Sequence, residues 1–193
     1  MGLIKMYIEN MALYMAAALP FYVLARILFL KRGKKHTTVL REIAVALFSL
    51  YIVGLASQTI IPRWSVEFDS STGTWDFYFL TTNEIAGVNL MPFRTVIMYF
   101  QSNQYVSDWE SVSLVNVVGN MFIFTPIGLF VPLLWRSMNR WWKVFLVGFC
   151  VTCFIEGIQF FIGRSSDIDD VILNTVGVMI GYGLAWIWLK IAR

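Results

Sequence analysis

The chain has 193 residues, of which 58% are hydrophobic and only 14% are charged. Soluble domains carry about 25% charged residues, and a folded domain of this length cannot cover so much apolar surface with its own polar groups. The composition therefore excludes a soluble enzyme, a disordered protein and a disulfide-stapled secreted domain. It indicates an integral membrane protein. The net charge of +3 is too small to indicate a nucleic-acid partner.

Five apolar segments predict transmembrane helices. Each is long enough to cross about 30 Å of hydrocarbon at about 1.5 Å per helical residue. The segments cover residues 6–30, 43–61, 112–135, 144–163 and 171–189. We therefore predict an all-α integral membrane protein, a five-helix transmembrane bundle that forms a single membrane domain over residues 1–193.

The basic residues predict how the bundle is oriented. Three regions carry most of them: the connection between the first two spans, the connection between the third and fourth, and the end of the chain. With five spans these regions share one side, which the positive-inside rule places in the cytoplasm. The N-terminus is then outside and the C-terminus inside. The residues concerned are Lys31, Arg32, Lys34, Lys35, Arg41, Arg136, Arg140, Lys143, Lys190 and Arg193.

The segment of residues 62–111 is expected outside, because it holds six acidic residues and only two basic ones, Arg63 and Arg94. Aromatic and polar residues alternate over 64–69 and 75–80 around a loop that contains Gly73, which predicts an extracytoplasmic β-hairpin. Residues 94–100 are apolar enough for a short interfacial helix. We expect this segment to lie as a lid on the bundle. The aromatic face of the hairpin would be covered by the membrane interface or by the spans below.

Polar residues inside apolar spans are the strongest functional signal, because they are costly in lipid. They recur at helical spacing on one face of each of the last three spans. In the fifth span Gly177 and Gly181 continue this face as a small-residue motif that lets helices approach closely, and Asp167 or Asp169 can cap its N-terminus. The polar groups could form a hydrogen-bond network that only joins the three helices, or a functional pocket toward the outer face. They are Asn116, Asn120, Glu156, Gln159, Arg164, Asp167, Asp169, Asp170 and Asn174.

Four segments resemble the motifs of the VanZ-like family of bacterial membrane proteins. They are N-L-M-P-F at residues 89–93, N-x-x-x-N-x-x-x-F-x-P-x-G at 116–128, E-x-x-Q at 156–159, and R-x-x-D-x-x-D-x-x-x-N-T-x-G at 164–177. The resemblance covers about residues 89–186. It implies a multi-pass protein of the bacterial plasma membrane. For some members it implies low-level resistance to teicoplanin-type lipoglycopeptides, without an established chemical reaction.

The first functional hypothesis is a binding pocket in the outer leaflet for a lipid headgroup, a lipid-linked cell-wall precursor or a lipoglycopeptide. Arg164 would bind a phosphate or carboxylate, and the amides would donate hydrogen bonds. Membrane lipids are the expected partners. We expect no cofactor, and the sequence does not predict the oligomeric state. The expected binding residues are Asn89, Asn116, Asn120, Glu156, Gln159, Arg164, Asp167, Asp170 and Asn174.

The alternative is an intramembrane enzyme that modifies a lipid-linked substrate of the cell envelope. Glu156 would act as general acid or base, and Asp167 with Asp170 could hold a divalent metal ion that bridges a phosphate. A transporter is disfavoured, because the five spans show no internal repeat and the cytoplasmic half of the bundle has no polar path.

Overall fold

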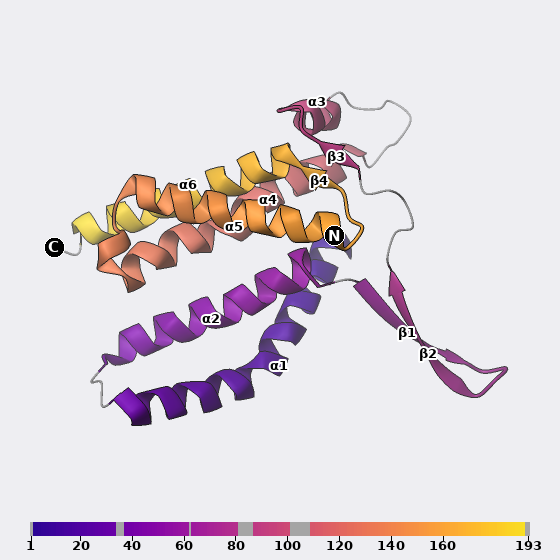
Figure 1. Cartoon of the computed structure of the whole chain (residues 1–193), viewed down its shortest axis with the longest axis horizontal. Helices are drawn as coiled ribbons and strands as arrows, with labels where there is room; N and C mark the ends of the chain where they lie inside the picture. The colour runs from indigo at the N-terminus through magenta and orange to yellow at the C-terminus, as the bar shows by residue number, and fades with distance from the viewer. Residues whose placement is uncertain (1, 34–36, 62, 81–86, 101–108, 192–193) are drawn as a thin grey trace.

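The computed structural model describes residues 2–33, 37–61, 63–80, 87–100 and 109–191. Its framework consists of long helices that run side by side (Figure 1). Five of the helices in this part of the chain are long and apolar enough to cross a membrane, which confirms the five predicted spans. They are α1 (Gly2–Gly33), α2 (Val39–Thr59), α4 (Trp109–Leu134), α5 (Trp141–Phe161) and α6 (Ile168–Ile191).

The two ends of the bundle differ in charge as the sequence predicts. One end holds the connection from α1 to α2, the 3-10 helix η1 (Arg136–Met138) and the end of α6 (Figure 1). The other end, called the hairpin end below, holds the start of α1 and the segment between α2 and α4. Lys34, Lys35 and Arg193 lie outside the described residues. The placement of the hairpin end outside the cell stays a prediction.

Helices α4 and α6 make the closest contact in the bundle. A Cβ atom on Gly181 would lie 1.9 Å from the carbonyl oxygen of Thr125, and one on Gly177 would lie 2.1 Å from that of Met121. The same is true of Gly128 on α4, because a Cβ atom there would lie 1.7 Å from the carbonyl oxygen of Val178 on α6. No carbon atom can approach an oxygen so closely, so the backbones touch only because these residues are glycines. This confirms the predicted close approach.

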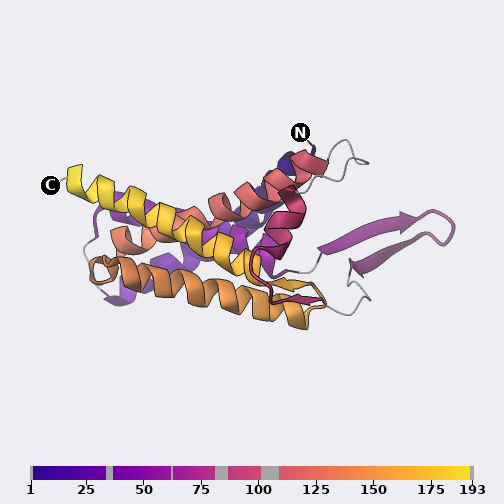
Figure 2. The same ribbon diagram turned by 90° about the horizontal axis from the view of Figure 1, so that it is seen from above.

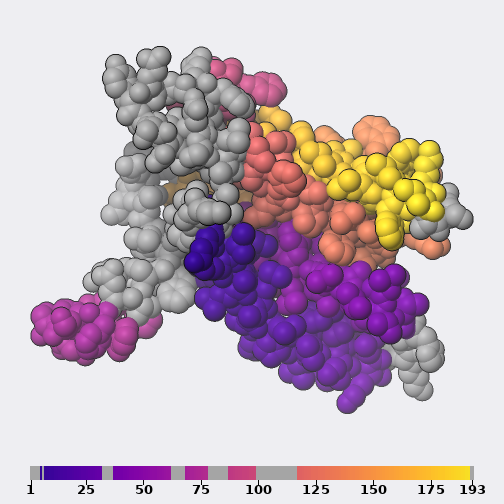
Figure 3. All heavy atoms as spheres, turned by 180° about the vertical axis from the view of Figure 1, so that it is seen from behind, coloured from indigo at the N-terminus to yellow at the C-terminus, as the bar shows by residue number. Residues whose placement is uncertain are grey.

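The core of the bundle is apolar. Phe124, Ile127, Val144 and Val178 are each at most 2% exposed. Helices α1 and α2 form a neighbouring pair (Figure 3). The Arg26 guanidinium joins this pair by donating from Nε and Nη2 to the two carboxylate oxygens of Glu42, at 2.7 and 2.6 Å.

The predicted hairpin is present as strands β1 (Arg63–Asp69) and β2 (Thr74–Leu80). The antiparallel register pairs Phe68 with Trp75, so alternate residues place the aromatic positions on one face. The turn is held by the Asp69 carboxylate, which accepts hydrogen bonds from the amide and the hydroxyl of Ser71 at 2.8 and 2.6 Å. These bonds lower the pKa of Asp69.

The hairpin does not lie as a lid on the bundle, and that expectation is wrong. The strands project beyond the end of the helices in three views (Figures 1, 2 and 3). Phe68, Trp75 and Phe77 are 53%, 64% and 69% exposed, so the spans do not cover the aromatic face. The physical reason is the short connection, because β1 begins just after α2 ends and continues outward from that helix. The membrane interface stays the prediction for what covers the aromatic face of the hairpin.

Candidate functional site

The segment after the hairpin is joined to the turn between α5 and α6. Strand β3 (Val88–Asn89) pairs in parallel with β4 (Ser166–Asp167), and the Ser166 amide donates to the carbonyl of Gly87 at 3.0 Å. The short helix α3 (Arg94–Phe100) follows, which confirms the helix predicted there. This pairing brings the N-L-M-P-F segment against the start of α6 (Figure 1).

Asp167 connects three elements at this junction. Its Oδ1 accepts from the Asp169 amide at 2.9 Å, which is an N-cap of α6 and confirms one of the two predicted caps. The same oxygen accepts from Nδ2 of Asn89 at 3.0 Å. Its Oδ2 accepts from the hydroxyl of Thr95. Both carboxylate oxygens of Asp167 are therefore occupied by protein donors.

Asp169 holds the beginning of α3. The carboxylate is 1% exposed and accepts from the backbone amides of Phe93, Thr95 at 2.8 Å and Val96 at 3.1 Å. Free amides at a helix start carry partial positive charge, so a carboxylate stabilises them. These amides flank Arg94, and Asp169 therefore fixes the backbone from which the Arg94 side chain extends.

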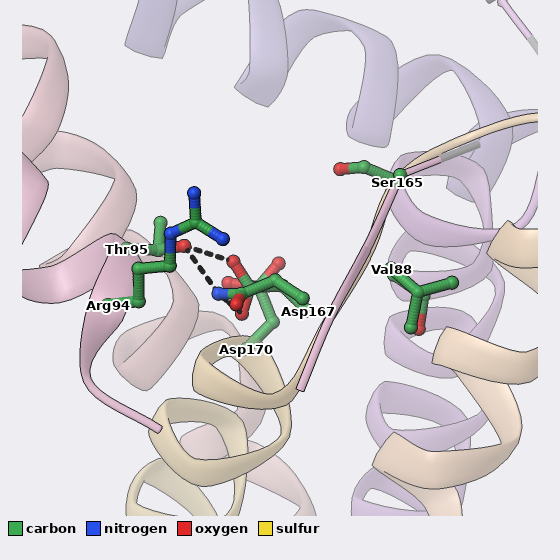
Figure 4. A pocket seen from close by; sticks show the side chains of 9 residues that line it. Val88, Arg94, Thr95, Ser165, Asp167 and Asp170 are labelled. Carbon is green, nitrogen blue, oxygen red and sulfur yellow. Dashed lines mark hydrogen bonds between the residues drawn. The ribbon is translucent and has the colours of Figure 1, made fainter. Parts of the chain in front are cut away.

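A cavity of about 370 Å³ opens between α3 and the turn before α6 (Figure 4). Arg94 and Thr95 of α3 stand on one side, and Asp167 and Asp170 at the start of α6 stand on the other (Figure 4). Asp167 and Thr95 are hydrogen-bonded across its floor. The lining residues are Gly87, Val88, Asn89, Arg94, Thr95, Ser165, Ser166, Asp167 and Asp170.

The cavity carries opposite charges that do not form an ion pair with each other. Arg94 is exposed, and its guanidinium makes no hydrogen bond or ion pair with the described residues. Asp170 accepts one hydrogen bond, from Nδ2 of Asn120 at 2.8 Å. It forms no ion pair with another residue that the structure describes. A ligand that enters the cavity therefore meets the guanidinium of Arg94 and the carboxylates of Asp167 and Asp170.

Glu156 and Asn174 lie deeper than the cavity and do not line it. Glu156 is 5% exposed, and its Oε2 accepts from the Asp167 amide at 3.0 Å. Asn174 is 4% exposed, and its Oδ1 has no hydrogen-bond partner among the residues that the structure describes. One turn below Glu156, the hydroxyls of Thr152 and Thr175 lie 3.4 Å apart. These groups form a buried polar layer beneath the cavity.

Gln159 and Arg164 are placed at a different location, the end of α2. Nε2 of Gln159 donates to the carbonyl of Thr59 at 3.0 Å. Nη1 of Arg164 donates to the carbonyls of Thr59 and Gln58 at 3.0 and 3.3 Å. The last carbonyls of a helix lack partners within it and carry partial negative charge. Arg164 therefore stabilises a helix end, and it does not line the cavity.

Only some of the residues predicted as one site lie at the cavity. Asn89, Asp167 and Asp170 line the cavity, while Asn120 and Glu156 hydrogen-bond to its walls. The side chain of Asn116 lies outside the described residues. Sequence reasoning missed the cavity positions of Arg94, Thr95, Ser165 and Ser166. A signal for Arg94 existed, because it is one of only two basic residues among residues 62–111.

The five apolar helices and the polar cluster at their hairpin end define a multi-pass membrane protein. Residues 48–189, well over half of the chain, match the family model VanZ/LLP1. The chain therefore belongs to the VanZ/LLP1 family, and the resemblance noted in its motifs is confirmed. No curated protein and no solved structure matches the chain.

Proposed function

We propose that the cavity binds an amphiphile in the outer leaflet of the bacterial plasma membrane whose headgroup carries a phosphate or carboxylate. The amphiphile would be a lipid, a lipid-linked cell-wall precursor or a lipoglycopeptide. The observation that carries the proposal is the Arg94 guanidinium on the cavity wall, which forms no ion pair with the residues that the structure describes. A guanidinium binds phosphate or carboxylate through two parallel hydrogen bonds. We assign to Arg94 the anion contact that the sequence predicts for Arg164, because Arg164 donates hydrogen bonds to the carbonyls at the end of α2.

An apolar surface beside the cavity favours an amphiphile over a soluble anion. Besides Val88, the segment that supplies Asn89 and Arg94 exposes five large apolar side chains. Exposed apolar groups gathered in this way mark contacts with lipid or with a ligand. An acyl or prenyl chain could lie against them while its headgroup occupies the cavity. The side chains are Leu90, Met91, Phe93, Ile97 and Met98.

Binding is better supported than an intramembrane reaction. Asp167 already holds the junction together, because its two oxygens accept three hydrogen bonds from protein donors. No group of three metal-ligating acids, histidines or cysteines is present among the residues that the structure describes. Glu156, the proposed acid or base, is buried below the cavity. Resistance to teicoplanin would follow if the amphiphile bound is the drug itself.

Arg94→Ala tests the proposal. The purified chain in a neutral maltoside detergent is titrated with short-chain phosphatidylglycerol in a calorimeter, and in a second series with teicoplanin. Loss of a charge-assisted bidentate contact should weaken binding about tenfold or more. Arg140→Ala removes the same charge at the opposite end of the bundle and should bind like the unmodified chain. Equal affinities for the two variants would refute the role of Arg94.

A further inference from the structure

We propose that the headgroup bound in the cavity is zwitterionic, with its anionic group on Arg94 and its ammonium group on Asp170. This inference rests on the proposed function and names the chemical class of the headgroup. Two opposite charges line the cavity on different sides. Arg94 belongs to α3, and Asp170 belongs to α6 (Figure 4).

The two charges do not neutralise each other. Within the described residues, the ion pairs are Lys5–Glu9 and Arg26–Glu42, so Arg94 and Asp170 are too far apart for direct contact. The space between them is part of the cavity of about 370 Å³. A headgroup that carries both charges would bridge this space. A simple anion would bind Arg94, but the carboxylate of Asp170 on the opposite wall would repel it.

Asp170 is the acid best suited to receive a cation. Asp167 accepts protein hydrogen bonds on both oxygens, and Asp169 is buried against the amides of α3. Glu156 is buried beneath the cavity and accepts from the Asp167 amide. Asp170 lines the cavity and has a single bond, to its Oδ1.

Asn120 prepares Asp170 for this role. Its Nδ2 donates to Asp170 at 2.8 Å and so fixes the carboxylate before a ligand arrives, which reduces the entropy lost on binding. At the boundary of a low-dielectric bundle an unpaired charge is costly, and pairing is worth more than in water. A ligand that satisfies Arg94 and Asp170 together removes both costs.

Three lipids with the same short acyl chains test the inference in the detergent system described above. Phosphatidylethanolamine has a phosphate and an ammonium that donates hydrogen bonds, phosphatidylcholine has a quaternary cation that cannot donate, and phosphatidylglycerol has no cation. We expect phosphatidylethanolamine to bind about tenfold or more tightly than phosphatidylglycerol, with phosphatidylcholine between them. Competition by soluble phosphoethanolamine distinguishes the source: equal affinity indicates a free zwitterion, and weaker affinity indicates a lipid.

Asp170→Asn removes the charge and keeps an oxygen for Asn120. The ratio of the affinities for phosphatidylethanolamine and phosphatidylglycerol should fall to about unity, because the neutral amide cannot form an ion pair with the ammonium. Asp76→Asn, in the projecting hairpin, should retain the preference. Equal binding of the three lipids by the unmodified chain would overturn the inference without any variant. If phosphatidylglycerol still binds through Arg94 in that case, the proposed function stands. If no lipid depends on Arg94, both fail.

Discussion

Gly181→Leu should destabilise the helix bundle by about 3 kcal/mol or prevent its folding. At this position even a Cβ atom would lie 1.9 Å from the carbonyl oxygen of Thr125. The obstacle is the backbone of α4, which cannot rotate away as a side chain would. The leucine would force α4 and α6 apart, and their separation would open the buried layer below the cavity. The readout is the midpoint of thermal unfolding in detergent, followed by tryptophan fluorescence.

Gly183→Leu is the matched control for this experiment. Gly183 lies two residues further along the same helix, and a Cβ there would meet nothing within 4 Å. The two variants have the same composition and differ only in the face of α6 that carries the leucine. The control should unfold within a few degrees of the unmodified chain. If the two variants lost stability equally, the close contact between α4 and α6 would be excluded.

Asp169→Ala should release α3 from the bundle and abolish ligand binding. The carboxylate is 1% exposed and accepts three backbone amides. Its removal would leave these buried donors without partners, at a cost of about 3 kcal/mol or more. The segment would then dissociate from α6 and Arg94 would lose its position. Hydrogen exchange measured by mass spectrometry should show faster exchange at residues 87–98.

This expected effect is local, and the rest of the bundle provides its internal control. The buried turns of α4 and α6 around Gly128 and Val178 should exchange as slowly in the variant as in the unmodified chain. Asp169→Asn keeps one acceptor oxygen and should give an intermediate increase in exchange. Unchanged exchange at residues 87–98 in Asp169→Ala would show that other contacts hold α3.

Local patterns predicted the elements of the fold correctly. Apolar run length defines a span, alternation defines a strand, and Asp167 precedes the fifth span as a helix cap. The glycines at 177 and 181 share one helical face, which is enough to predict a close contact. The spacing of these glycines does not predict that α4, with its Gly128, is the partner in the contact. Periodicity identifies a helix face but does not identify which element packs on it.

Long-range pairing accounts for what the sequence could not predict. Val88 and Asn89 pair with Ser166 and Asp167 through two-residue strands, which are too short to leave a pattern. The sequence predicts that Arg164 binds a phosphate or carboxylate. Its side chain instead donates to the end of α2, which lies over 100 residues earlier in the chain. The projection of the hairpin likewise depends on the direction in which α2 ends.

A structure of the chain in nanodiscs made from native bacterial lipid tests the central claim most directly. We predict density for a headgroup in the cavity lined by Asn89 and Ser166, with its anionic group in contact with the Arg94 guanidinium. A cavity closed around an ion pair between Arg94 and a protein carboxylate, with no headgroup present, would contradict the account.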